Sequence, residues 1–329
     1  MKIGLYSVSY MGLWYDGPAL SLPQVVERAK RFGYAGVSLA GKRPHASPLD
    51  MDERACAKLQ EAAENAQIEL VAIEGYTDFM DPVKEHREAQ LIWLKELMKL
   101  AQRLSIPLIR VFGGWGGIVR TSDHWSYSGI WREALKYASN HQRWHWIREC
   151  LTEAAKWAAD YDVTLALQNH PPPFRHGYED TLRMVQEIDL PRLRMSLDVG
   201  AGCFTHDLHN PEYVAKAVAA CSDVMVHSHP NGIFRKADNG AFYQEPYDSP
   251  GLNPPAPGDG LMLPYPSFVA ELQKIHYEGY LMYEVCGPVL KDHALQGIDE
   301  VDSRVEAAAG YFKQLVDAVA CGESVPQPA

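Results

Sequence analysis

The chain lacks the features that mark membrane-spanning, nucleic-acid-binding and disulfide-rich proteins. Its 329 residues hold no run of about 18 apolar residues, and the opening MKIGLYSVSY has no basic, apolar leader. Lys and Arg number 31 against 42 Asp and Glu, and no basic cluster offers a phosphate-binding surface. The six cysteines are scattered, without a CxxC pair. We therefore expect a cytoplasmic protein in a reducing compartment that binds neither nucleic acid nor membrane.

Strand-like and helix-like segments alternate from one end of the chain to the other. Eight short apolar runs, each separated from the next by a helical pattern, lie at 2–9, 36–40, 68–75, 107–115, 163–170, 193–200, 223–230 and 279–285. Such alternation is typical of a parallel sheet covered by helices. It predicts an α/β fold, a single (β/α)8 TIM barrel over residues 1–329.

Two segments interrupt this rhythm, after the fourth and the seventh predicted strands. Residues 113–140 contain Trp115, Trp125 and Trp131, and we expect them either to pack on the barrel or to form an aromatic lid over a ring-shaped ligand. Residues 230–264 are rich in Pro and Gly without strand or helix period, which predicts a long inserted loop. Both insertions should border one cavity, because both leave the carboxyl end of the barrel.

Four polar residues close apolar runs in the second half of the chain: Gln168, Asp198, His229 and Glu284. Gln168 and Asp198 are 30 positions apart, and Asp198 and His229 are 31 apart, about the length of one strand, loop and helix. Carboxyl ends of barrel strands converge on one rim, so these side chains predict a site for a hard or borderline divalent cation. The alternative is that they are ordinary capping or ion-pair residues.

The stretch HSHPNGIFR, together with these four positions, resembles the xylose isomerase-like superfamily of sugar phosphate isomerases and epimerases. The resemblance covers essentially the whole chain. It implies that Gln168, Asp198, His229 and Glu284 hold Mn²⁺, or alternatively Mg²⁺. It also implies that Arg235 binds substrate, as the Arg six residues after the second His of the His-x-His pair. His227, the first His of that pair, is either a substrate contact or a core residue.

Two departures from the family pattern affect the expected chemistry. The sequence DVGAGCF lacks the His that often follows the Asp. Gln168 stands where the family has a first metal-binding Glu, and a carboxamide can bind a cation through its oxygen but cannot take up a proton. His170 lies two positions after Gln168 and so on the same side of the strand, which makes it a candidate for a single catalytic base. The alternative is that His170 is a rigid loop residue.

A second resemblance concerns the loops GLYSVSYMGLWYDGPALSL and GKRPHASPLDM, which look like those of the catalytic large subunits of C-glycoside deglycosidases. It implies metal-assisted enolisation of a 3-keto-glycoside, elimination of its aglycone, and pairing with a small β-rich subunit. The predicted substrate contacts are Trp14, His45, Arg110, Trp115 and His227. We also expect the chain to form an oligomer.

Three functional hypotheses follow. The first is a metal-dependent lyase that acts on a keto-sugar glycoside, with His170, Glu284 and Arg235 in catalytic roles. The second is an isomerase or epimerase of a ketose, a sugar phosphate or a sugar acid, in which Glu284 is one base and another group the second. The third is a sugar-binding barrel whose site has decayed at Gln168; the intact Asp198, His229 and Glu284 argue against it.

Overall fold

A computed structural model describes most of the chain. The described residues are 1–120, 125–127, 135–171, 173–174, 177–200, 210–246, 263–291 and 294–322. Among the helices in these ranges, none is long and apolar enough to cross a membrane.

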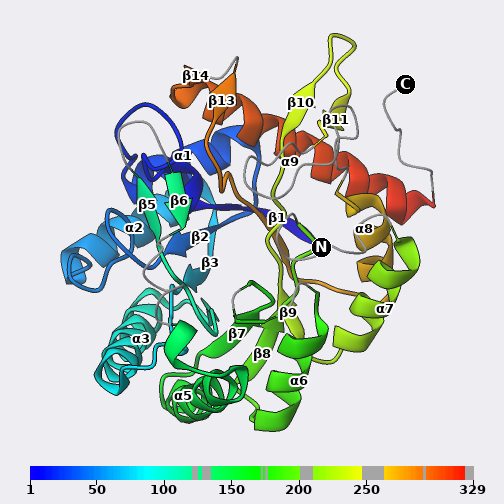
Figure 1. Ribbon diagram of the computed structural model, residues 1–329. Helices are drawn as coiled ribbons and strands as arrows, with labels where there is room; N and C mark the ends of the chain where they lie inside the picture. The colour runs from blue at the N-terminus through cyan, green and yellow to red at the C-terminus, as the bar shows by residue number, and fades with distance from the viewer. Residues whose placement is uncertain are drawn as a thin grey trace.

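Eight parallel strands form the sheet at the centre of the molecule (Figure 1), as predicted. In spatial order they are β12 (Tyr280–Tyr283), β1 (Lys2–Tyr6), β2 (Gly36–Ala40), β3 (Glu69–Glu74), β4 (Leu108–Val111), β7 (Thr164–Gln168), β8 (Leu193–Ser196) and β9 (Met225–His227). The ends of the sheet meet just beyond β9, where the Met282 amide donates to Ser228 O (3.0 Å) and the Glu284 amide to Pro230 O (3.1 Å). These two bonds bring the first and last strands of the sheet together as a barrel.

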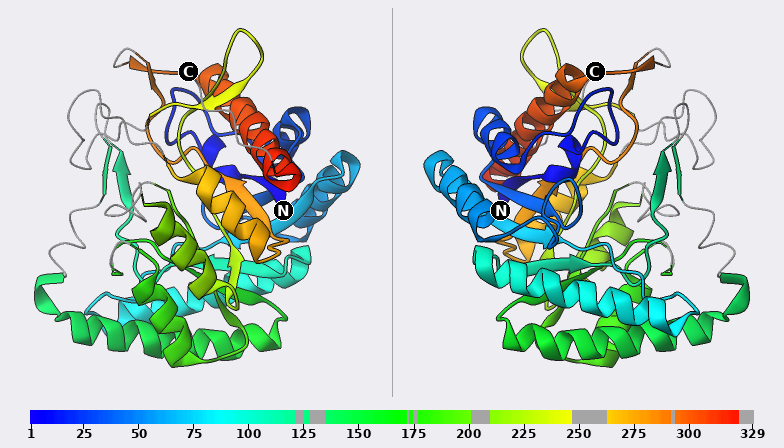
Figure 2. Two further views of the ribbon diagram at one scale, coloured as in Figure 1. Left: turned by 90° about the vertical axis from the view of Figure 1, so that its right-hand side faces the viewer. Right: turned by 90° about the vertical axis from the view of Figure 1, so that its left-hand side faces the viewer.

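One α-helix follows each barrel strand and covers its outer side (Figures 1 and 2). They are α1 (Leu22–Phe32), α2 (Glu53–Ala66), α3 (Lys84–Leu104), α5 (Asn140–Asp160), α6 (Glu179–Ile188), α7 (Pro211–Cys221), α8 (Tyr265–Lys274) and α9 (Ile298–Cys321). The helical patterns of the sequence at 21–33, 52–67, 82–104 and about 141–161 predict α1, α2, α3 and α5 to within a few residues.

Local sequence signals explain where these helices begin and end. Ser21 and Gln24 form a capping box at the start of α1, and Gly33 ends the helix in a left-handed conformation with φ 78°. Between these caps, Leu22, Val25 and Ala29 recur on one face and are buried against the barrel. The capping residues and the apolar face indicate the same helix, so the limits of α1 could be predicted from the sequence.

The two insertions contain short hairpins that the sequence pattern did not reveal. After β4, strands β5 (Ile118–Arg120) and β6 (Trp125–Tyr127) pair antiparallel, followed by the 3-10 turn η2 (Leu135–Tyr137). After β9, strands β10 (Phe234–Lys236) and β11 (Phe242–Gln244) do the same. The prediction of a loop without strands over 230–264 was therefore wrong for its first part, because three-residue strands are too short to show a period. A further hairpin, β13 (Leu290–Lys291) with β14 (Ala294–Leu295), precedes α9.

Phe234 anchors the hairpin β10–β11 to the body of the protein. Its fully buried ring contacts the rings of Tyr311 and Phe312 on α9, with centroids 4.8 and 5.2 Å apart, and that of Tyr283 on β12 at 5.6 Å. Aromatic packing of this kind adds to the free energy gained from burial. The insertion after β9 is therefore held against the barrel by a side chain at its own start.

We expect Phe234→Ala to lower the free energy of unfolding by about 3–5 kcal/mol, the usual cost of removing a buried aromatic ring. Phe242→Ala, on the paired strand, should cost much less because Phe242 is only half-buried. Urea unfolding followed by circular dichroism measures both. Equal losses for the two variants would show that Phe234 has no special role.

Candidate functional site

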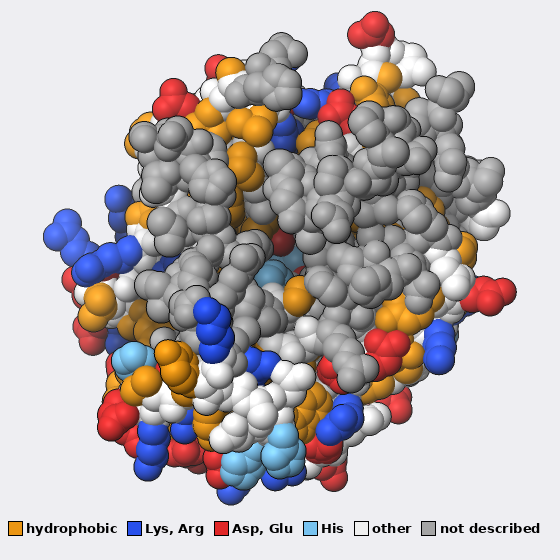
Figure 3. Space-filling view, viewed as in Figure 1, with side chains coloured by type: hydrophobic (Ala, Val, Ile, Leu, Met, Phe, Trp, Pro, Cys, Tyr) orange, Lys and Arg blue, Asp and Glu red, His pale blue; other side chains and the backbone are white. Residues whose placement is uncertain are grey.

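The carboxyl ends of four barrel strands carry the polar residues singled out from the sequence. Gln168 is the last residue of β7, Asp198 and His229 each lie two residues beyond β8 and β9, and Glu284 directly follows β12. In the space-filling view onto this face, acidic and histidine atoms are visible at the floor of a central hollow (Figure 3). Strand ends that converge on one rim are where barrel active sites are built.

Gln168, Asp198 and His229 are buried, and Asp198 contacts the other two. The Gln168 amide nitrogen donates to Asp198 Oδ2, and the His229 backbone amide donates to Asp198 Oδ1 at 2.8 Å. His229 Nδ1 lies 3.5 Å from Asp198 Oδ2. Burial alone would raise the pKa of Asp198, but the facing His229 and these hydrogen bonds lower it below its usual value. Asp198 is therefore a carboxylate at neutral pH.

Glu284 interacts electrostatically with Asp198 and His229. Removal from water raises the pKa of its carboxyl to about 7, with Asp198 adding to the rise and His229 opposing it. Most of this rise comes from burial, and repulsion between the Glu284 and Asp198 carboxylates adds to it. A bound cation would relieve that repulsion.

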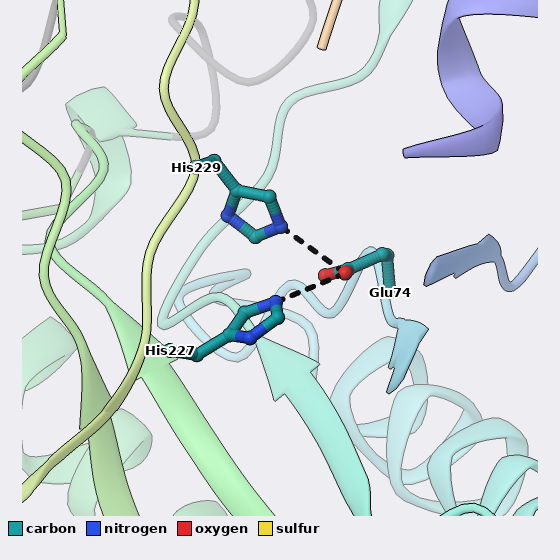
Figure 4. Close-up of side chains that lie close together, drawn as sticks. All are labelled: Glu74, His227 and His229. Atoms are coloured by element: carbon teal, nitrogen blue, oxygen red, sulfur yellow. Dashed lines mark hydrogen bonds and ion pairs between the residues drawn. The ribbon is translucent and has the colours of Figure 1, made fainter. Parts of the chain in front are cut away.

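A fifth strand end, that of β3, adds a carboxylate that faces both histidines (Figure 4). Glu74 Oε1 lies 3.2 Å from His227 Nε2 and 3.1 Å from His229 Nε2. Burial alone would raise the pKa of Glu74, but the two imidazoles lower it well below its usual value. Burial alone would likewise lower the pKa of His229, but Glu74 and Asp198 raise it to about 10. His229 thus sits between two carboxylates, in a strongly negative potential.

Arg110 balances part of this negative charge. It is the cross-strand neighbour of Glu74 in the β3–β4 pair, and its Nε donates to Glu74 Oε2 at 2.9 Å. A second nitrogen donates to Tyr6 Oη at 3.3 Å, and the Tyr6 and Tyr76 hydroxyls are 2.5 Å apart. The guanidinium also lies 3.9 Å from the centroid of Phe112. Arg110, predicted as a substrate contact, is buried in this network.

His170 lies at an aromatic wall beside the hollow. Its ring is 5.0 Å from that of Phe112 and 5.5 Å from that of Trp115, centroid to centroid, in edge-on geometry. Phe112 and Trp115 stack in parallel at 4.9 Å, and Trp115 also contacts Tyr76. The structure thus brings the predicted base and one predicted substrate contact, Trp115, together. The side chains of Trp125 and Trp131 lie outside the described residues, so the lid remains a prediction.

Two other predicted site residues, Arg235 and His45, have their polar atoms engaged elsewhere. The Arg235 guanidinium, on β10, donates to Glu245 at 3.1 Å and to Glu300 of α9 at 2.6 Å. His45 is buried, with Nδ1 3.0 Å from Ser7 Oγ and Nε2 3.1 Å from Leu20 O, and burial lowers its pKa to about 4. Trp14 is buried in the core. Substrate binding by Arg235 or His45 would require breaking these contacts, so their roles stay predictions.

The donor atoms of this hollow fit a divalent cation. Gln168 Oε1 is buried without a hydrogen-bond partner in the described structure, and neither ring nitrogen of His229 makes a well-directed hydrogen bond there. Amide oxygen, carboxylate and imidazole are ligands that Mn²⁺ and Mg²⁺ accept. Among the His, Cys, Asp and Glu side chains of the described residues, the group whose ligand atoms lie within 4.8 Å of one another is Glu74, His227 and His229, which overlaps with the first set at His229. The residues present can therefore hold a cation with His229 as the shared ligand.

Sequence reasoning missed Glu74. A signal for it was present, because Glu74 closes the apolar run LVAIE as Gln168 and Glu284 close theirs. Lys42 lies in the loop after β2, in the stretch GKRPHASPLDM. Its Nζ lies 3.7 Å from the Tyr76 ring centroid, and burial lowers its pKa to about 8.

Comparison with known proteins agrees with this geometry. The family model described as "Xylose isomerase-like TIM barrel" matches residues 26–313, and the chain belongs to this superfamily of sugar isomerases and epimerases. It is accordingly an enzyme of that superfamily. No curated protein sequence matches the chain.

Solved structures of similar fold cover nearly the whole chain at low sequence identity. An L-ribulose 3-epimerase is 12% identical over 98% of this chain and 96% of its own, with a TM-score of 0.66. The 3-keto-D-glucoside 4-epimerase YcjR from E. coli is 18% identical over 94% and 98%, with a TM-score of 0.63. The probable 3-DHS dehydratase AsbF from Bacillus anthracis is 18% identical over 95% and 99%, also with a TM-score of 0.63. At such identities the likeness shows the fold.

Loss of a residue that contacts a metal ligand typically weakens metal binding roughly 10- to 100-fold. We expect Asp198→Asn to weaken Mn²⁺ binding by more than this, because the side chain would lose the charge that attracts the ion. Isothermal titration calorimetry measures the affinity. Asp238→Asn, the same change at an exposed position on the β10–β11 turn, is the control and should bind like wild type. Mn²⁺ binding that survives Asp198→Asn unchanged would contradict the assignment, as would metal-soaked crystals without anomalous density among Asp198, His229 and Glu284.

Proposed function

We propose that the chain is a divalent-cation-dependent enzyme that removes the proton next to the carbonyl of a keto sugar, and that epimerisation or isomerisation is its reaction. The observation that carries this proposal is the convergence of Asp198, His229 and Glu284, with the amide of Gln168, at the carboxyl end of one barrel. The epimerases of similar fold give it independent support.

In this proposal some residues of the site bind a cation and others move a proton. Gln168, Asp198, His229 and Glu284 would hold the cation, Mn²⁺ in our first expectation. When bound, it would polarise the carbonyl oxygen and stabilise the negative charge of an enolate. In this proposal Glu284 exchanges a proton with one face of the sugar, and His170, at the aromatic wall formed with Phe112 and Trp115, is a candidate base.

Elimination from a 3-keto-glycoside is the second candidate, and Gln168 is the observation that favours it. Epimerisation needs a proton carrier on each face of the substrate, but Gln168 cannot carry a proton and its amide is bonded to Asp198. With His170 as a single base, the enolate would instead expel the group on the next carbon. AsbF, whose fold is similar, is described as a probable dehydratase, and dehydration is also an elimination. The expected small β-rich subunit belongs to this candidate.

Solvent exchange tests both candidates with the same measurement. The Mn²⁺-loaded protein is incubated in D₂O with L-ribulose, D-psicose or a 3-keto-D-glucoside. Proton NMR follows the signal of the hydrogen on the carbon next to the carbonyl. Deuterium uptake with appearance of the epimer supports the first candidate. Uptake with release of the glycosidic group supports the second. A lack of deuterium uptake in all three substrates contradicts the proposal.

We expect His170→Ala to lower turnover by about 10² to 10⁴, the usual cost of removing a general base, while Mn²⁺ still binds. His145→Ala, at an exposed position on α5, is the control and should retain activity. Steady-state kinetics on the substrate that shows exchange gives the comparison. Full activity of His170→Ala would remove His170 from the mechanism.

Gln168→Glu separates the two candidates. For an epimerase, the new carboxylate supplies a second proton carrier and should speed formation of the epimer. For a lyase, the added negative charge beside the cation weakens its pull on the carbonyl oxygen, so elimination should slow. Initial rates of both reactions, measured on wild type and variant at equal Mn²⁺ saturation, distinguish these outcomes.

A further inference from the structure

Glu74 is buried among the histidines of the site, yet the mechanism above gives it no role. It is fully inaccessible to solvent, and it comes from a strand on the far side of the barrel from β9. It contacts two imidazoles (Figure 4) and the guanidinium of Arg110. Burying a carboxylate is costly unless other groups pair with it. Here the Arg110 guanidinium and the two imidazoles are those groups. Its contacts therefore point to a role in the site.

We infer that Glu74 is a positioning residue for the metal ligand His229: its carboxylate holds the Nε2 side of the imidazole, which leaves Nδ1 to bind the divalent cation beside Asp198. This inference rests on the cation of the proposed function. Which imidazole nitrogen binds a metal is set by the group that faces the other nitrogen. Carboxylates in that outer position orient the ring and raise its basicity.

The two edges of the His229 ring face different carboxylates. Nε2 lies 3.1 Å from Glu74 Oε1, while Nδ1 lies 3.5 Å from Asp198 Oδ2, to which Gln168 is also bonded. The His229 backbone amide, bonded to Asp198 Oδ1 at 2.8 Å, fixes the start of the side chain. Nδ1 is therefore the nitrogen on the side of Asp198 and Gln168.

Arg110 holds Glu74 in this role. Its Nε donates to Glu74 Oε2 at 2.9 Å and its Nη1 to Gly75 O at 2.8 Å, so the carboxylate is held by the strand next to its own. The permanent positive charge of Arg110 at that distance pairs with the carboxylate. It also repels a metal ion bound directly to Glu74, which argues against Glu74, His227 and His229 as the ligand set. His227 Nε2 lies within hydrogen-bond distance of the same oxygen Oε1, at 3.2 Å, and its ring is 4.6 Å from that of His229.

Mn²⁺ affinity and the bonding of the His229 nitrogens test this inference without reference to turnover. Isothermal titration with Mn²⁺ compares wild type with Glu74→Gln, and ¹⁵N NMR of histidine-labelled protein follows the imidazole nitrogens as Mg²⁺ is added. We expect Glu74→Gln to bind Mn²⁺ about 10- to 100-fold more weakly. In wild type, Mg²⁺ should shift Nδ1 of His229 while Nε2 keeps its proton.

Three further variants control for fold and for the competing ligand set. Glu74→Gln leaves Arg110 buried without its partner, so the double variant Glu74→Gln, Arg110→Gln removes both charges and should show the same loss of affinity. Glu69→Gln makes the same change at the exposed start of β3 and should bind like wild type. His227→Gln removes the other imidazole and should bind Mn²⁺ nearly as tightly as wild type.

The outcomes separate this inference from the proposed function. If His227→Gln loses Mn²⁺ as completely as Glu74→Gln, the ion binds directly to Glu74 and both histidines, and the positioning role is overturned. A shift of Nε2 on addition of Mg²⁺, or wild-type affinity in the double variant, overturns it too. Failure of the wild type to bind Mn²⁺ overturns the cation and this inference together. Mn²⁺ binding without deuterium uptake in the sugars contradicts only the proposed function.

Discussion

The arrangement of charge inside the barrel mouth is the constraint on which the rest of the site depends. Glu74 and Asp198 are buried and Glu284 is partly buried, and the permanent cation Arg110 contacts Glu74. The negative charge of Glu74 and Asp198 raises the pKa of His229 to about 10, while burial, with a further contribution from Asp198, raises the pKa of Glu284 to about 7. A divalent cation bound to His229 would take the place of the proton, since metals bind imidazole in its neutral form.

This charge arrangement exists because the barrel closes. Glu74 on β3 and His229 beyond β9 are 155 positions apart, and each helix and loop between them serves to bring the strand ends to one rim. Closure depends on the backbone bonds from Met282 and Glu284 to Ser228 and Pro230. The second of these bonds also orients Glu284, so the contact that completes the barrel places a candidate catalytic residue.

The fold and half of the site could be predicted because the signals were local. Each barrel strand is a short apolar run, and Gln168, Asp198, His229 and Glu284 stand at or just beyond the ends of such runs, one repeat or more apart. The partners of those residues could not be predicted in the same way. Arg110 and Glu74 lie within adjacent strands, and their pairing depends on the β3–β4 register. Arg235 matched a family motif. Its guanidinium is held by Glu245 and by Glu300, and no pattern in the sequence pointed to either contact.

The sequence by itself determined the alternation of strands and helices, hence the barrel, and the kinds of ligand atoms at four strand ends, because both depend on residues close together in the chain. Only the tertiary structure decided which side chains face one another across the barrel: that Gln168 bonds to Asp198, that Glu74 faces His227 and His229, and that His45 is enclosed by Ser7 and Leu20. The physical reason is that burial and Coulomb interaction act between groups near in space. Their strength, and with it the protonation of every group in the site, is set by distances that exist only once the barrel has closed.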